Sequence, residues 1–191
     1  HDSHRRQRQM CIRDRIKDGD IQMEELKENI TFENLNFEYV PNFPVLKDVN
    51  VEIIKGKTTA IVGSTGSGKS TLIKLILRFY EKKSGNILFD NIEIESLTIE
   101  SLRSKIGLVS QDVFLFEGTV FENIAYGNID ASIEEVWNAA RLSESDKFIS
   151  ELPNQENTIV GERGQKLSGG QRQRISIALS LIHISEPTRQ P

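Results

Sequence analysis

The residues with the clearest chemical meaning form one glycine-rich run. Residues 63–70 read Gly-Ser-Thr-Gly-Ser-Gly-Lys-Ser and fit the pattern G-x-x-x-x-G-K-[ST] at every position. The apolar residues 59–62 predict a strand before this run, and residues 71–77 predict a helix after it. A strand, a glycine-rich loop and a helix in this order are typical of a phosphate-binding loop, or P-loop. The ligand predicted from this loop is a nucleoside triphosphate together with Mg²⁺.

Each part of this loop has a physical task. Glycines permit backbone angles that a side chain would forbid, so successive N–H groups can converge on a phosphate next to the positive end of a helix. Lys69 is predicted to reach the β- and γ-phosphates, and Ser70 to place its hydroxyl on Mg²⁺. A glycine-rich turn that only starts a helix is the alternative, and the complete match disfavours it. The predicted nucleotide-binding residues of this region are Gly63, Ser64, Thr65, Gly66, Ser67, Gly68, Lys69, Ser70 and Thr71.

Composition narrows the class of protein. The chain has 191 residues, 37% of them hydrophobic, and a net charge of −4. This length fits one globular domain, and the acidic balance argues against nucleic acid as a partner. No run approaches the roughly 18 apolar residues of a membrane span. A single cysteine, Cys11, excludes an internal disulfide framework.

The two ends of the chain differ in character from its middle. Residues 1–15 are rich in arginine and have no periodicity, and residues 182–191 interrupt a helical pattern. Both strings resemble translated sequencing-adapter sequence, so we expect them to be non-native; a basic arm and a short polar tail are the alternatives. No metal site or histidine catalysis is predicted from these ends, although they hold every histidine and the cysteine: His1, His4, Cys11 and His183.

The middle of the chain predicts strands first and helices later. Residues 31–40 alternate with a period near two and predict a strand that Pro41 and Pro44 end, and residues 45–54 predict a second strand. Residues 86–94 predict a hairpin, residues 106–110 a short buried strand, and residues 16–26 a helix or linker. Helices are predicted from a capping box at Ser132 through Ala140, over 145–152, and from Gly169 onward. On the last of these, one apolar face comprises Ile175, Ala178, Leu179 and Ile182.

A second motif follows about a hundred residues after the first. Residues 167–174 read Leu-Ser-Gly-Gly-Gln-Arg-Gln-Arg. Ser168 has the position of a helix N-cap, and the two glycines after it expose backbone N–H groups, which makes a second anion site. A lone Ser-Gly-Gly would indicate only a capped helix, but these eight residues match the signature sequence of ATP-binding-cassette (ABC) proteins. Over about residues 30–181, the chain resembles the nucleotide-binding domain of an ABC transporter.

The resemblance implies roles for further residues. Tyr39 is similar to the aromatic residue that stacks on adenine, with a packed core aromatic as the alternative. Gln111 is similar to the glutamine that contacts Mg²⁺ and senses the γ-phosphate. Lys69 and Gln111 are then the catalytic residues, and Ser70 and Gln111 the metal ligands. The signature residues expected to face a partner's ATP are Leu167, Ser168, Gly169, Gly170 and Gln171.

Other segments point to the exporter type. Residues 114–127 are similar to exporters whose membrane and ATPase domains share one polypeptide, and residues 161–164 resemble the exporter loop thought to touch the membrane domain. The expected fold is α/β, a P-loop NTPase core with an N-terminal antiparallel β region and a helical insertion over about 119–152. Residues 16–30 are expected to be a linker from a missing membrane domain, and 31–181 an incomplete nucleotide-binding domain.

The resemblance also implies partners and an absence. A second nucleotide-binding domain is expected to pair head to tail with this one, and transmembrane domains are expected to hold it at the cytoplasmic face of a membrane. The family continues after the signature helix into a strand ending in Asp-Glu and a switch histidine, and neither is found here, so the fragment is predicted to be inactive alone. A non-transport ABC ATPase in DNA repair or translation is the alternative function. A P-loop kinase would have no use for residues 167–174.

Overall fold

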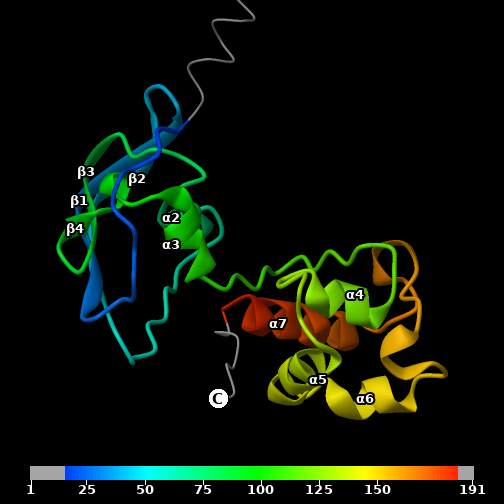
Figure 1. The fold of residues 1–191 in the computed structure, drawn as a ribbon. Coiled ribbons are helices and arrows are strands. Elements are labelled where there is room, and N and C mark those ends of the chain that lie inside the picture. The colour runs from blue at the N-terminus through cyan, green and yellow to red at the C-terminus, as the bar shows by residue number, and fades with distance from the viewer. Residues whose placement is uncertain (1–15, 185–191) are drawn as a thin grey trace, which may run out of the picture. The chain divides into compact units, whose positions relative to one another are not determined.

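The computed structural model describes residues 16–184. The chain forms two compact units, which divide between Arg103 and Ser104 (Figure 1). The predictions for residues 1–15 and 185–191, including those for His1, His4 and Cys11, lie outside the described residues.

The first unit contains a four-stranded antiparallel sheet in the order β2-β1-β3-β4. Alternate residues are buried at Leu35 and Phe37 of β1 and at Ile87 and Phe89 of β3, which agrees with the period-two interpretation. The alternation is interrupted between Phe32 and Leu35, where the register of β1 shifts. The strands are β1 (Asn29–Val40), β2 (Phe43–Ile54), β3 (Ser84–Phe89) and β4 (Ile92–Glu93). Pro41 ends β1 as predicted, but Pro44 lies inside β2. The sheet tolerates it because β2 is an edge strand, where a missing N–H need not break the ladder.

The turn between β3 and β4 anchors the start of the sheet. Asp90 and Asn91 have φ values of 49° and 69°, as a two-residue hairpin turn of type I′ requires. The Asp90 carboxylate accepts backbone N–H groups at 2.6, 2.7 and 3.0 Å from Lys27, Glu28 and Asn29. Burial raises the pKa of Asp90, but these three hydrogen bonds outweigh it and hold the pKa below its ordinary value.

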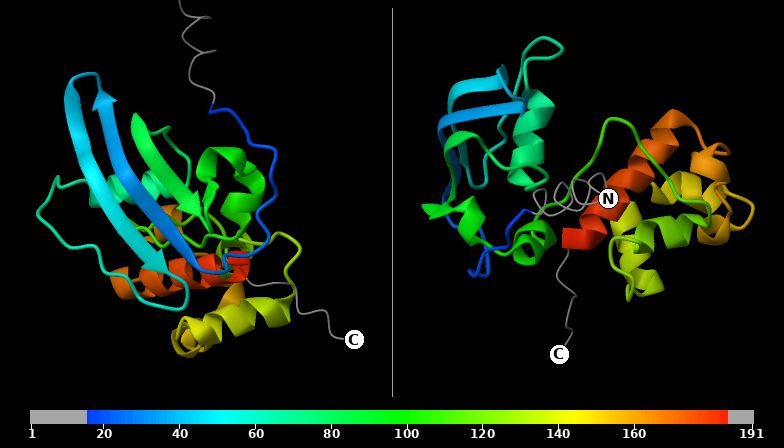
Figure 2. Two further views of the ribbon diagram at one scale, coloured as in Figure 1. Left: turned by 90° about the vertical axis from the view of Figure 1, so that its left-hand side faces the viewer. Right: turned by 90° about the horizontal axis from the view of Figure 1, so that it is seen from above.

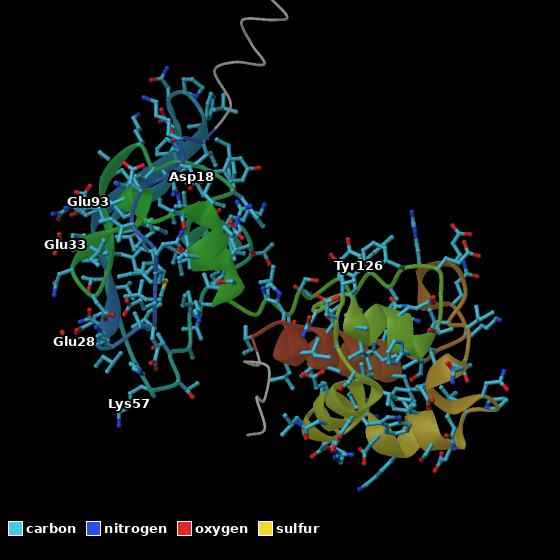
Figure 3. All side chains as sticks on the ribbon, viewed as in Figure 1. Asp18, Glu28, Glu33, Lys57, Glu93 and Tyr126 are labelled. Atoms are coloured by element: carbon cyan, nitrogen blue, oxygen red, sulfur yellow. The ribbon has the colours of Figure 1, made fainter. Side chains whose placement is uncertain are left out.

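The segment before β1 is extended, so the helical alternative for residues 16–26 is wrong, and the linker interpretation stays a prediction. Main-chain hydrogen bonds of Ile21 nevertheless tie it to Ser96 of η1 (Ile94–Ser96) and to Thr98, the residue before α3 (Ile99–Ser104). The Asp18 carboxylate accepts the Ile99 N–H at 2.7 Å, and Figure 3 shows Asp18 beside this unit. The buried Arg78 donates to the carbonyls of Lys17 and Leu97. These bonds make the segment part of the first unit.

Two predicted strands are not formed. Residues 59–62 and 106–110 carry no strand assignment, and Val62 is 86% exposed while Leu108 is 45% exposed. A strand of a parallel sheet needs a hydrogen-bonded neighbour, and neither segment has a ladder partner among residues 16–184. Apolar composition alone therefore predicted strands that lack the pairing they require.

The second unit is helical, as the predicted insertion requires. Its long helix α7 (Gly169–Ile184) packs against α4 (Val120–Ala125) and α5 (Ile133–Leu142), as Figure 1 shows. Shorter elements complete it: α6 (Asp146–Glu151), η2 (Gln155–Asn157) and η3 (Glu162–Gly164). The predicted capping box of Ser132 and Glu135 is confirmed at the start of α5.

The sequence predicted that the helical pattern breaks at residue 182, and the structure shows that this is wrong. Helix α7 continues through Ile184, because the side chain of Ile182 fills the core and is 3% exposed. Ile175 and Ala178 are buried on the same face, as predicted, while Leu179 is only partly buried.

Candidate functional site

The P-loop residues lead directly into α2 (Lys69–Ile76) in the first unit. Gly68 is the N-cap of this helix with φ 91°, and no side chain caps it. A Cβ at Gly68 would lie 2.6 Å from Leu46 Cδ2 and 3.3 Å from the Val45 carbonyl oxygen, so only glycine fits. The first N–H groups of α2 therefore have no side-chain acceptor within the loop, which suits an anionic ligand.

Lys69 places a positive charge on the same loop. Its Nζ donates to the carbonyl oxygens of Gly63 at 2.9 Å and Ser64 at 2.7 Å, and lies 3.4 Å from Ser67 Oγ. The ammonium thus holds the start of the loop to the start of the helix. The Ser70 side chain next to it is exposed, whereas Thr71 is buried. The structure therefore places Lys69 and Ser70, the predicted phosphate ligand and one of the two predicted Mg²⁺ ligands, next to each other at the start of α2.

Tyr39 on β1 lies beside this helix. Its hydroxyl is 3.2 Å from the Thr71 hydroxyl, which fastens the strand to α2. Figure 2 shows this helix lying alongside the strands of the first unit. Tyr39 is 43% exposed, so it is not a fully buried core residue. An exposed aromatic ring tethered next to a P-loop can stack on a nucleotide base.

Gln111 belongs to the second unit. It lies in an exposed bend between Ser110 and Asp112, where the Ser110 hydroxyl donates to the Asp112 carbonyl at 2.8 Å. The Gln111 side chain faces solvent, so its amide is available to a ligand.

The signature residues begin α7 with a capping box. The Ser168 N–H donates to Gln171 Oε1 at 2.8 Å, and the Gln171 N–H donates to Ser168 Oγ at 3.2 Å. Ser168 is therefore the N-cap that the sequence predicted. The reciprocal role of the Gln171 side chain was missed, although the Ser-x-x-Gln spacing could have shown it.

The two signature glycines have no crowding neighbour. A Cβ at Gly170 would meet nothing within 4 Å, and one at Gly169 would meet only Arg172 Nη2 at 3.9 Å. Neither glycine has a positive φ. Glycine costs a helix stability relative to alanine, and the described part of the chain gives no packing reason for it here. The open space suits a group that approaches from outside.

Comparison with known proteins identifies the family. The profile of the ABC transporter family matches residues 46–186. The chain belongs to the ABC transporter family. It is 49% identical over 153 residues to an uncharacterized ABC transporter ATP-binding protein, YwjA, of Bacillus subtilis, which covers 80% of the chain and 27% of the relative. It is 42% identical over 171 residues to the human mitochondrial iron-sulfur clusters transporter ABCB7, covering 90% of the chain and 23% of the relative.

A solved structure agrees with this assignment. A bacterial Atm1-family ABC exporter with ATP bound matches with a TM-score of 0.84 and 40% identity, over 91% of the chain and 31% of that protein. The chain thus spans only 23% to 31% of the length of these three relatives. No helix within residues 16–184 is long and apolar enough to cross a bilayer.

The structure shows a structural role for Arg172 of the signature that the sequence did not predict. Arg172 Nη1 donates to the Leu167 carbonyl at 2.6 Å and approaches the Gly164 carbonyl at 3.4 Å. It therefore connects the signature to the turn η3, whose Gly164 has φ 72° and packs directly on it. The exposed side chains of Glu162 and Arg163 are held out from this rigid turn. An arginine within the signature gave no sequence signal for this role.

The donor set also fits the metal expected for an ABC ATPase. Mg²⁺ takes oxygen ligands and is usually bound through substrate phosphates and one or two protein groups rather than by an all-protein cage. The exposed Ser70 hydroxyl at the start of α2 is such a group. In residues 16–184 no group of three or more His, Cys, Asp or Glu side chains forms a metal site.

Proposed function

We propose that this chain is the ATP-binding domain of an ABC exporter and couples ATP binding and hydrolysis to transport across a membrane. The observation that carries the proposal is the presence, in one chain, of two helix starts suited to phosphate. One is the uncapped α2 with Lys69, and the other is the start of α7 with two glycines that face open space.

The two helix starts have different tasks in the proposed mechanism. The P-loop binds the phosphates of ATP, with Lys69 on the β- and γ-phosphates and Tyr39 on the base. Ser70 and Gln111 are the proposed protein ligands of Mg²⁺, which would neutralise part of the charge on the phosphates. Residues 167–171 bind the γ-phosphate of ATP held by a second nucleotide-binding domain, which pairs head to tail with this one.

Pairing then drives the transport cycle. Closure of the two domains on ATP moves transmembrane domains, and hydrolysis resets them. The exposed turn at Glu162 and Arg163 is the proposed contact with the membrane domain. Transport is favoured over DNA repair or translation because the relatives named above are transporters and exporters. The acidic side chains Glu28, Glu33 and Glu93 on the first unit, labelled in Figure 3, also suit a protein without a nucleic-acid partner.

Catalysis needs residues beyond those found in this chain. An Asp that holds Mg²⁺ and a Glu that polarises the attacking water are expected after the signature helix, but the only acidic residue of the sequence after Ser168 is Glu186. Residues 1–191 by themselves should therefore bind ATP without turning it over. We also propose that residues 1–15 and 182–191 are non-native.

A binding experiment tests the proposal. Calorimetric titration of the 191-residue chain with MgATP should show binding that Lys69→Ala weakens at least tenfold, for ADP as well, because the ammonium acts on phosphates of both nucleotides. Lys57→Ala is the matched control, since it removes an equal charge at an exposed site of the same unit (Figure 3). Equal effects of the two variants would mean that Lys69 acts only through net charge, and the P-loop assignment would fail.

A further inference from the structure

A lysine outside the P-loop lies against the proposed base-stacking residue. Lys74 Nζ is 5.6 Å from the ring centroid of Tyr39 and 6.0 Å from that of Tyr80. Both distances are within the range in which an ammonium is attracted to the face of an aromatic ring. Neither Lys74 nor Tyr80 has a role in the site described so far.

The aromatic rings themselves form a braced cluster. Tyr39 and Tyr80 meet edge to face, with centroids 5.0 Å apart at 85°, and Phe37 meets Tyr39 at 4.7 Å and 89°. Such edge-to-face contacts are the favoured geometry of aromatic pairs. Phe37 is buried, whereas both tyrosines are 43% exposed. The cluster therefore fixes the tilt of Tyr39 and still leaves part of the ring open.

Helix α2 supplies the remaining contacts on Tyr39. Thr71 and Lys74 are three residues apart and therefore share one face of this helix. Thr71 contacts the Tyr39 hydroxyl at 3.2 Å, and Lys74 lies over the ring. Tyr80 follows four residues after the end of α2. The helix that begins at the phosphate loop thus also holds the base-stacking ring in two places.

We propose that Lys74 and Tyr80 are positioning residues for Tyr39, and that Lys74 raises the affinity for the nucleotide base without contacting the phosphates. The proposal rests on the proposed function, because it needs ATP to be bound by this P-loop. The ammonium attracts π-electron density toward one face of the Tyr39 ring. The base then stacks on the opposite face, which is electron-poorer and already fixed in orientation, so binding loses less side-chain freedom.

A direct phosphate contact is the competing role for Lys74. The P-loop already has its cation, because Lys69 Nζ is bonded to the carbonyls of Gly63 and Ser64. Lys74 is five positions further along α2 and lies with the rings instead. The two roles differ in one measurable respect: a phosphate contact acts on any polyphosphate, whereas a contact through Tyr39 acts only on ligands that carry a base.

The test uses the 191-residue chain and two probes, MgATP and Mg-tripolyphosphate, in calorimetric titrations. Lys74→Gln should weaken ATP binding about 2- to 5-fold, the range expected for an exposed cation–π contact. Tripolyphosphate binding should not change. Lys57→Gln is the matched control for loss of one positive charge. Tyr80→Leu should weaken ATP binding while Tyr80→Phe, which keeps the ring, should not.

A double-mutant cycle decides whether Lys74 acts through Tyr39. In a Tyr39→Leu background, Lys74→Gln should have no further effect on ATP affinity. Loss of tripolyphosphate binding equal to the loss of ATP binding would overturn the proposal, as would an undiminished effect of Lys74→Gln without the Tyr39 ring. An unchanged ATP affinity in Lys74→Gln would overturn it as well. If the wild-type chain did not bind ATP, the proposed function itself would fail, which is a distinct result.

Discussion

Replacing Gly170 by alanine should stabilise the chain while damaging its proposed function. Gly170 is the second residue of α7, it has no positive φ, and a Cβ there meets nothing within 4 Å. Alanine is favoured over glycine in a helix by about 0.5–1 kcal/mol. For a chain of this length, 1 kcal/mol shifts Tm by roughly 2–4 °C. Gly170→Ala should therefore raise Tm by about 1–4 °C.

Gly164→Ala is the matched comparison, and it should have the opposite effect on Tm. Gly164 has φ 72°, and its Cβ would lie 2.9 Å from both Arg172 Cδ and Leu115 Cδ1. Left-handed backbone strain costs an alanine about 1–2 kcal/mol, and overpacking adds about 1–3 kcal/mol. The sum, about 2–5 kcal/mol, should lower Tm by at least about 4 °C.

Thermal unfolding followed by circular dichroism measures both variants. A lower Tm for Gly170→Ala would show that the fold needs this glycine, which would refute the argument that the space is kept for an external group. The functional half of the prediction needs the chain within a complete transporter that is deficient in hydrolysis. There, light scattering should show that ATP pairs the wild-type domains but not those with Gly170→Ala, because the added methyl group occupies the space proposed for the partner's nucleotide.

Three further outcomes are expected. Tyr39→Phe should lower Tm slightly, because it removes a hydrogen bond to Thr71 worth about 0.5–1.5 kcal/mol, but it should leave ATP affinity nearly unchanged. Tyr39→Ala should lose about 1–3 kcal/mol of ATP-binding free energy. Equal affinity losses for the two variants in a calorimetric titration would contradict stacking. The depressed pKa of Asp90 gives stability that is fully present above the ordinary value of 3.8 and is lost as pH falls through the folded pKa. The difference in unfolding free energy between wild type and Asp90→Asn, measured by denaturant titration at decreasing pH, should therefore shrink. A difference that stays constant with pH would contradict this role of Asp90. Ser168→Arg in the complete transporter should abolish ATP-dependent pairing in light scattering and leave the domain's own nucleotide affinity close to normal, because the signature is proposed to act on the partner's ATP. A loss of affinity would place Ser168 in its own P-loop site.

Local rules predicted the parts of the fold that local interactions decide. The hairpin at Asp90 and the capping box at Ser132 follow from residue types a few positions apart, and both are present. The strands predicted at 59–62 and 106–110 are absent because strand formation depends on a partner distant in sequence, which apolar composition does not reveal. Helix α7 passes residue 182 for a similar reason, since burial of Ile182 in the core overrides the local pattern.

In the candidate site, too, the sequence predicted the features formed by neighbouring residues and missed the contacts between distant ones. Motif spacing identified the P-loop and the signature, because their tasks are carried by residues adjacent in the chain. The contacts of Arg172 with Leu167 and Gly164, and of Lys74 with Tyr39, join residues of different elements or different turns, and only the structure shows them.

The placement of Tyr39 has a consequence for how the nucleotide is held. One helix of eight residues, α2, starts at the predicted phosphate loop and contacts the Tyr39 ring, the proposed stacking surface for the base, through Thr71 and Lys74. Tyr39 itself is on β1, which is otherwise fixed by the sheet. A base stacked on this ring and phosphates bound to the loop would therefore both resist movement of α2 relative to β1. ATP, which engages both ends, should rigidify this pair of elements more than either a base or a polyphosphate alone, and hydrogen exchange of the α2 amides with each ligand would measure the difference.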